Sequence, residues 1–141
     1  MNLPKNLMAC ILFILSWIVL CFTLSILSGW SKLARKYPGK MKNIEERYWF
    51  CWNWFGKNLI GIKYGPLLTA DLGPEGLGLS LLFPFRLWHS PILIPWESIK
   101  EIETKKMWMI HYARIEVDET VVNIRGEKGQ AVFRYYKRKE R

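Results

Sequence analysis

The sequence contains few of the residues on which catalysis and metal binding usually depend. Its 141 residues include two histidines and three cysteines. It has no H-E-x-x-H, C-x-x-C or glycine-rich phosphate motif. His111 lies in an apolar stretch, which favours a structural role for it. Because no nucleophile and base form a local signature, we expect no enzyme, no cofactor and no metal site.

Acidic residues and long apolar runs are also scarce. Asp and Glu number 12 against 21 Lys and Arg, which gives a net charge of +9. A single apolar run is long enough to cross a membrane, and this excludes a multispanning transporter. The remaining length suits about one small domain, which excludes a multidomain enzyme. The pattern predicts one basic domain attached to one apolar segment.

Residues 7–27 form that uncharged run of 21 residues. As a helix it would be about 30 Å long, the thickness of the hydrocarbon core of a bilayer. A cleaved signal peptide is the alternative, but its apolar core would be about 7–15 residues long and a small-x-small site would follow it. Thr23-Leu24-Ser25 is a poor site of that kind and lies inside the run. We therefore predict a transmembrane helix over residues 7–28.

Positive charge on either side of the run predicts its orientation. Lys5 precedes it, and five cations follow it before the first acidic residue: Lys32, Arg35, Lys36, Lys40 and Lys42. The positive-inside rule then places the amino terminus outside and the carboxyl-terminal domain in the cytoplasm of a single-pass inner-membrane protein. Trp30 is expected in the headgroup layer. Only Cys51 lies beyond the run, so the domain has no disulfide framework, as expected in a reducing compartment.

The predicted organisation has five parts. They are a tail at 1–6, the transmembrane helix at 7–28, a basic juxtamembrane connector at 29–47, a small β-rich domain at 48–133 and a basic tail at 134–141. The connector could continue the transmembrane helix to about Tyr37, before the break at Pro38-Gly39. The spacing of Val132 and Tyr136 permits a short C-terminal helix.

The segment 48–55 has six aromatic residues in eight. It could be a buried strand whose rings fill a small core, or an aromatic segment in the membrane interface. The need of a small domain for large core side chains favours the first reading. The sequence does not decide between them.

Most of the remaining chain has strand signals. A turn at 73–76 leads into residues 77–87, where Leu77, Leu79, Leu81, Phe83, Phe85 and Leu87 alternate onto one face. Pro84 in this strand indicates an edge or a bulge. Further strands are expected at 59–63 and 67–72, divided by a break at Gly65-Pro66, and at 92–94, with a helical turn at 97–102. Strands at 107–117 and 120–125 are expected to form a hairpin around Asp118-Glu119. Six or seven short strands predict a mainly β domain, either a small barrel or a sandwich.

Two sets of residues are candidates for binding. Arg86, Trp88 and His89 could form an exposed cluster for an anionic or aromatic group, or Trp88 could pack inside while His89 caps a turn. The second set is basic and attracted to anionic lipid: Lys32, Arg35, Lys36, Lys137, Arg138 and Lys139. A topology signal followed by a solvated tail would explain the same charges. We expect no nucleic-acid partner, since no recognised module occurs.

Several short motifs resemble a bacterial group of small, uncharacterised membrane proteins. They are Ser28-Gly29-Trp30 with Leu33-Ala34 and Tyr37, Gly76-Leu77-x-Leu79-Ser80, Phe85-Arg86, and Pro91-Ile92-Leu93-Ile94-Pro95-Trp96-Glu97-x-Ile99. The order of strand, turn, strand and Ile-Pro-Trp is similar to parts of bacterial pleckstrin-homology-like domains. The resemblance covers residues 28–102 and implies a small barrel with a terminal helix, without an assigned activity.

These observations favour a membrane-anchored, non-catalytic cytoplasmic module that contacts a protein partner or anionic lipid headgroups. The alternative is a small accessory or immunity-type subunit whose apolar helix packs against another membrane protein. Membrane lipid and a protein of unidentified kind are the expected partners.

Overall fold

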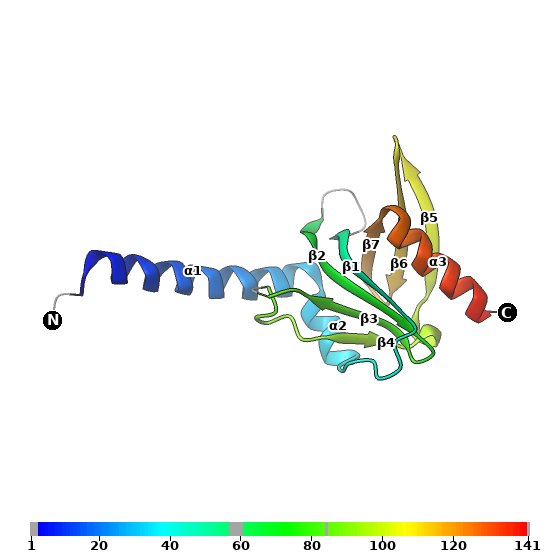
Figure 1. Ribbon diagram of the computed structural model, residues 1–141, viewed down its shortest axis with the longest axis horizontal. Helices are drawn as coiled ribbons and strands as arrows, with labels where there is room; N and C mark the ends of the chain where they lie inside the picture. Colours follow the sequence, from blue (N-terminus) through cyan, green and yellow to red (C-terminus); the bar gives the residue numbers. More distant parts are fainter. Residues whose placement is uncertain (1–2, 57–60, 84, 141) are drawn as a thin grey trace.

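The computed structural model describes residues 3–56, 61–83 and 85–140. Its first element is the helix α1 (Lys5–Ser28), which projects from a β domain so that the two chain ends lie at opposite ends of the molecule (Figure 1). Within the described ranges, α1 is the one helix whose length and composition would allow it to cross a membrane. A single N-terminal apolar helix followed by a mainly β domain is what the sequence predicts.

The helix α1 does not continue to Tyr37. It ends at Gly29, whose φ of 89° is unfavourable for residues with a side chain. A separate short helix, α2 (Trp30–Lys36), then leaves in another direction (Figure 1). A Cβ at Gly29 would also approach Thr120 Oγ1 to 3.0 Å. This glycine therefore both redirects the chain and lets the bend lie close to the domain.

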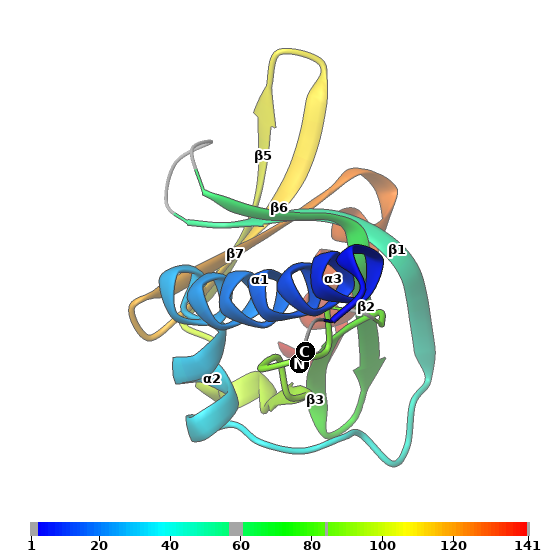
Figure 2. The same cartoon turned by 90° about the vertical axis from the view of Figure 1, so that its left-hand side faces the viewer.

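Seven antiparallel strands form one sheet in the order β4-β3-β2-β1-β7-β6-β5. Their bounds are β1 (Glu46–Phe55), β2 (Ile62–Gly73), β3 (Gly76–Leu81), β4 (Ile92–Ile94), β5 (Glu101–Met107), β6 (Ile110–Val117) and β7 (Thr120–Arg125). The sheet curls strongly, which Figure 2 shows from the side to which α1 projects. The domain is therefore a half-barrel, and the predicted mainly β fold class is confirmed.

The long strands β1 and β2 connect the two halves of the sheet. Their register shifts between Cys51 and Asn53, opposite Gly65. Asn53 Nδ2 donates hydrogen bonds to the carbonyl oxygens of Cys51 and Gly65, both at 3.0 Å. The predicted break at Gly65-Pro66 is therefore wrong, because the irregular pairing is accommodated inside one strand. Of the predicted strand 59–63, Leu59 and Ile60 lie outside the described residues.

The strand predicted at 77–87 is shorter than expected. Leu77, Leu79 and Leu81 are buried on β3, but β3 ends at Leu81 and turns follow it. Phe83, expected in the core, is 84% exposed. Pro84 lies outside the described residues, as do Met1, Asn2 and Arg141 in the predicted tails. The alternation in the sequence continues past the point where pairing with β2 stops, and this misplaces the end of the strand.

The region after β4 also differs in detail from the prediction. The helical turn is a 3₁₀ turn, η1 (Trp96–Ser98), and the next strand, β5, begins at Glu101. The predicted strand 107–117 is wrong, since a two-residue turn at Trp108-Met109 separates β5 from β6. The predicted hairpin around Asp118-Glu119 and the strand 120–125 are confirmed.

The chain ends in the helix α3 (Gly126–Glu140), which includes residues 134–140 of the predicted tail. It packs against β5, β6 and β7 at the end of the domain opposite α1 (Figure 1). Val132 and Tyr135 are buried, and the Tyr135 ring stacks on Trp96 with centroids 5.3 Å apart. The short helix permitted by the sequence is thus a full structural element.

The half-barrel core includes side chains from α2 as well as from the sheet. Trp30 is 0% exposed and contacts the rings of Phe55 and Tyr64 at 5.5 and 5.9 Å. The prediction that Trp30 lies in a headgroup layer is therefore wrong. The aromatic segment 48–55 divides between core and surface. Cys51, Asn53, Trp54 and Phe55 are buried, whereas Trp49, Phe50 and Trp52 are exposed.

Candidate functional site

The helix α1 is joined to the half-barrel through a stripe of small residues. Cys21, Ser25 and Ser28 are buried, at a spacing that puts them on one helix face. Ser25 Oγ donates a 2.7 Å hydrogen bond to the Trp88 carbonyl oxygen. Ser28 Oγ lies 2.8 Å from the Tyr64 hydroxyl. The last turns of α1 are therefore fixed to β2 and to the β3–β4 loop, residues 82–91.

His89 is the centre of this junction and is 1% exposed. Its Nδ1 lies 2.8 Å from the Leu87 carbonyl oxygen, and its Nε2 lies 2.9 Å from the Tyr64 hydroxyl. Since a carbonyl oxygen can only accept, Nδ1 carries the proton and Nε2 accepts from Tyr64. Burial lowers the pKa of His89 and raises the pKa of Tyr64 to about 12. Both groups are neutral at pH 7 and their role at this position is structural.

The β3–β4 loop lies along α1 and carries apolar side chains, of which Phe83, Leu87 and Trp88 are exposed and Phe85 is half-buried. Phe85 meets the ring of Trp17 at 4.8 Å, and Trp88 meets Phe22 at 5.3 Å. Trp88 has a φ of 63°, a region that costs a residue with a side chain on the order of 1–3 kcal/mol. The bond from Ser25 to the Trp88 carbonyl helps to hold this conformation. Together with Phe83 and Leu87, these two residues form a surface that we call the apolar loop surface.

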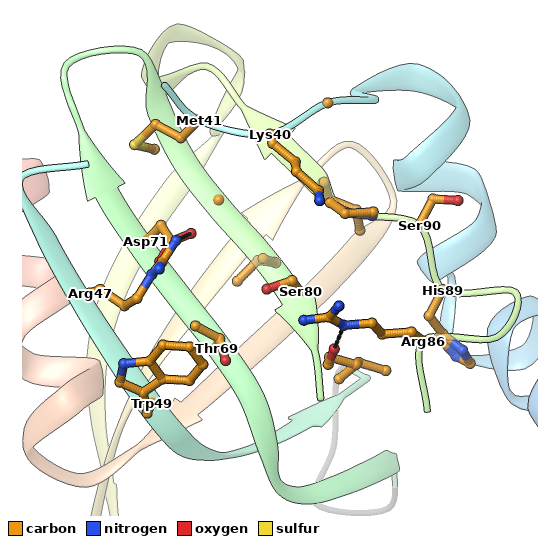
Figure 3. Close-up of a pocket in the computed structure, with 16 residues that line it drawn as sticks. Lys40, Met41, Arg47, Trp49, Thr69, Asp71, Ser80, Arg86, His89 and Ser90 are labelled. Carbon is orange, nitrogen blue, oxygen red and sulfur yellow. Dashed lines mark hydrogen bonds and ion pairs between the residues drawn. The ribbon is translucent and has the colours of Figure 1, made fainter. Parts of the chain in front are cut away.

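Beneath this loop is a cavity of 380 Å³ on the outer face of β2 and β3. Figure 3 shows the polar side chains that surround it. Arg47 makes two hydrogen bonds to Asp71, of 2.7 and 3.2 Å, so the charges of these two residues compensate each other. Thr69 and Ser80 contribute hydroxyl groups to the lining. The cavity is therefore polar on the side of the strands.

Two further cations line the cavity, Lys40 from the segment after α2 and Arg86 from the loop. Both extend toward the space between the loop and the strands (Figure 3). The Arg86 Nε donates to the Leu81 carbonyl oxygen at 3.0 Å. Neither cation forms an ion pair with a carboxylate of the described residues. Three cations and one carboxylate give the lining an excess of positive charge, which suits an anionic group.

The three residues of the predicted loop cluster do not act as one surface. Arg86 is exposed and lines the cavity. Trp88 is 52% exposed and turned toward α1. His89 is buried in the cavity wall, with both ring nitrogens hydrogen-bonded inside the protein. The alternative in which His89 is a structural residue of the turn agrees with this geometry.

The predicted basic residues fall into two distant groups. Lys32, Arg35 and Lys36 lie on α2, and Lys36 Nζ pairs with Asp118 Oδ2 at 2.9 Å. The second group, Lys137, Arg138 and Lys139, lies in the last turns of α3, at the end of the domain farthest from α1 (Figure 1). Arg138 pairs with Glu46 at 3.2 Å. The two groups therefore cannot face one flat surface at the base of α1.

Several residues of the site were not among the sequence-based candidates. Lys40, Arg47, Asp71 and Ser80 come from separate segments, and only the folded sheet brings them together. The junction residues carried a recognisable signal. Cys21, Ser25 and Ser28 are small residues at helical spacing in a run otherwise rich in Leu, Ile and Phe, a pattern that marks a helix face in close contact with protein.

A second cavity, of 280 Å³, lies near the tip of the β5–β6 hairpin. Trp52, Trp54 and Tyr112 supply its aromatic wall, and Lys63 and Arg125 its cations. At the hairpin tip, Trp108 and Met109 are 90% and 92% exposed. The lining of this second site is mainly aromatic, whereas the first combines polar and apolar side chains.

No protein-family model matches this chain, and no curated protein is similar enough to assign it to a family. What the structure supports of the resemblance is its coarse architecture, an apolar helix, a curled antiparallel half-barrel and a C-terminal helix. In the described part of the chain, no three His, Cys, Asp or Glu side chains gather as a metal site would require.

Proposed function

We propose that the protein is a membrane-anchored, non-catalytic binding module of the pleckstrin-homology-like type. In this proposal α1 crosses the inner membrane once, with its amino terminus outside and the half-barrel in the cytoplasm. The helix has 24 residues, its most apolar stretch of 18 residues has a mean hydropathy of 2.7, and few residues of that stretch are buried inside the protein. The cations that follow it support the cytoplasmic placement of the domain.

The junction favours an anchor over a cleaved signal sequence. Ser25 and Ser28 hydrogen-bond to the domain, and Trp30 directly after α1 is part of the core. Cleavage at the end of α1 would remove the contacts of Ser25 and Ser28. A helix built into the domain in this way has a structural role in the mature protein.

An anionic phospholipid headgroup is the ligand that the cavity under the loop suits best. The observation that carries this proposal is the pair Lys40 and Arg86, two cations without a carboxylate partner in the described chain, facing the same cavity. The hydroxyl groups of Thr69 and Ser80 add hydrogen-bonding groups on the other side. Arg86 also belongs to the β3–β4 loop, which lies along α1. The cavity therefore opens beside the helix that would hold the domain at a membrane.

The test is a calorimetric titration of the full chain, in neutral detergent, with a soluble short-chain phosphatidylglycerol and with the matching phosphatidylcholine. We expect binding of the anionic lipid alone. The double variant Lys40→Gln and Arg86→Gln should weaken it at least about tenfold, or ~1.4 kcal/mol. A control that removes two cations elsewhere, Lys106→Gln and Lys139→Gln, should leave it unchanged. Equal losses in both double variants would contradict a specific site.

Topology can be tested independently of binding. A single cysteine at Lys139, in a chain whose native cysteines are replaced by alanine, should resist an impermeant thiol reagent in intact cells and react after lysis. Rapid labelling in intact cells would reverse the proposed orientation.

A protein partner is the second candidate, in which the chain is an accessory or immunity-type subunit. Trp108 and Met109 support it, because two large, almost fully exposed apolar side chains at a hairpin tip are typical of a contact with another protein. Capture of a partner from native membranes should then be lost in the variant Trp108→Ser and Met109→Ser. The variant Lys40→Gln and Arg86→Gln should retain it.

A further inference from the structure

We propose that the β3–β4 loop is a second membrane-inserted element, which enters the bilayer beside α1. The surface that enters is the apolar loop surface of Phe83, Phe85, Leu87 and Trp88. The inference rests on the proposed membrane anchor and adds to it a defined depth and orientation for the domain.

The length of α1 supports insertion of the loop. Phe85 contacts Trp17, which lies 11 positions before the end of α1 at Ser28, or about 16 Å along the axis. Only Lys5–Ser16 precede this contact, a length of about 18 Å. A hydrocarbon core of about 30 Å needs roughly 20 helical residues. If α1 crosses the bilayer, the part of α1 beside the loop has to be inside it, and the loop is inside with it.

The composition of the loop agrees with this location. Every residue from 82 to 88 is apolar except Arg86. Phe83 is 84% exposed, Trp88 52% and Leu87 41%, although the domain has a core only a few residues away. Such a cluster next to a membrane helix is continuous with the apolar surface of that helix. Lipid that surrounds α1 would therefore cover the cluster as well.

Hydrogen bonds to several backbone groups lower the cost of placing this irregular loop in a bilayer, where each unpaired peptide group is costly. Five carbonyl oxygens at the end of β3 and in the loop accept hydrogen bonds from groups of the protein. They are those of Leu81, Leu82, Arg86, Leu87 and Trp88. The donors to three of them are side chains, from Arg86, His89 and Ser25. The N–H groups of Phe85 and His89 are bonded within the loop. The loop thus presents side chains outward while these polar backbone groups face inward.

The one charge of the loop is placed to leave the apolar layer. The Arg86 guanidinium turns back toward the strands and lines the polar cavity (Figure 3). Long cationic side chains commonly reach from an apolar position to the headgroup layer in this way. Insertion of the loop would therefore place the cavity with Lys40 and Arg86 at headgroup depth.

The experiment measures the depth of nitroxide labels in the full chain reconstituted into phospholipid nanodiscs. Single cysteines replace Phe83, Leu87, Leu12 or Met109 in a chain whose native cysteines are alanine. Leu12 reports on α1, where it is 58% exposed. Met109 is the matched control, an exposed apolar side chain at a loop tip that does not lie along α1. The readout is the ratio of accessibility to oxygen over accessibility to a soluble nickel chelate.

We expect a ratio several-fold higher at Phe83, Leu87 and Leu12 than at Met109. A high ratio at Leu12 with equal values at Phe83, Leu87 and Met109 would overturn the inserted loop and leave the anchor intact. A low ratio at Leu12 would overturn the proposed anchor, and the inserted loop with it. Two labelled positions in the loop guard against a local effect of either substitution.

Discussion

The two halves of the sheet carry surfaces of different character. Strands β4, β3 and β2 adjoin α1 and α2, and their loop exposes apolar rings beside a helix that is itself apolar. Strands β7, β6 and β5 carry α3, whose last turns are cationic. The positive charge most obvious in the sequence, at residues 137–139, is thus at the end of the domain farthest from α1 (Figure 1).

Under the proposed membrane placement, charge alone does not identify the membrane-facing surface. The basic residues of α3 have local roles, since Arg138 pairs with Glu46 and Lys139 lies 5.9 Å from the Tyr135 ring. In the β3–β4 loop beside α1, where a bilayer would be, the exposed apolar residues are Phe83, Leu87 and Trp88. The two basic groups, both expected from the sequence to be attracted to anionic lipid, lie at opposite ends of the domain and do not form one continuous surface.

The strongest test of the comparison is Trp30→Ala. Trp30 belongs to α2 in sequence but to the core in space, and Phe55, Tyr64 and His89 surround its ring. Loss of such a side chain costs about 3–5 kcal/mol. The free energy of unfolding of the full chain in detergent, from urea titration, should fall by that amount.

Trp108→Ala on the far half is the control, because Trp108 is 90% exposed. Its effect should stay within about 0.5 kcal/mol. Equal effects of the two substitutions would mean that Trp30 is not part of the core, and the headgroup position first expected for it would return.

The next test concerns the end of β3. Leu81 is 1% exposed, and Leu81→Ala should destabilise the domain by about 2–5 kcal/mol. Phe83→Ala, two residues on and expected on the same face from the sequence, should change the free energy of unfolding by less than about 0.5 kcal/mol. Similar large losses of unfolding free energy at both positions would mean that the strand continues to Phe83, as the sequence predicts.

A smaller effect is expected from the pH dependence of the junction. Because burial lowers the pKa of His89 in the folded chain, the unfolded state takes up the proton more readily. The stability contributed by neutral His89 is present above about pH 6.5, the ordinary value, and is lost as the pH falls below it. The urea midpoint should therefore fall from pH 7.5 to 5.5, and by less in His89→Gln. Parallel curves for the two chains would exclude His89 as the group responsible.

Much of the fold could be predicted from the sequence because its signals are local. Alternation gave Leu77, Leu79 and Leu81 as a buried face, and turn residues located the hairpins at Pro74-Glu75 and Asp118-Glu119. The same local rules misplaced the end of β3, since alternation does not reveal where a pairing partner stops.

The candidate site was less predictable because it depends on contacts distant in sequence. Arg86 was a candidate, but Lys40 is 46 positions from it and joins it only after the sheet has curled. The buried position of Trp30 is hard to predict for the same reason. A tryptophan after an apolar run is typical of a headgroup contact, and nothing local reveals that Gly29 turns it into the core.

The smallest effect should come from Lys36, where two interpretations compete. From the sequence, Lys36 shares a helix face with Lys32 and was expected to contact anionic lipid. In the structure its ammonium group pairs with Asp118 in the β6–β7 turn, and the Tyr37 hydroxyl donates to the same carboxylate at 3.3 Å. A double-mutant cycle of Lys36→Gln and Asp118→Asn should therefore give a small stabilising coupling that disappears in 1 M salt, because both side chains are partly exposed. The same cycle with Lys32→Gln should give none, since Lys32 has no contact with Asp118 in the described structure. Equal coupling for both lysines would mean that Asp118 responds to the overall positive charge of α2 and not to a specific pair with Lys36. The cations of α2 would then be available to contact lipid.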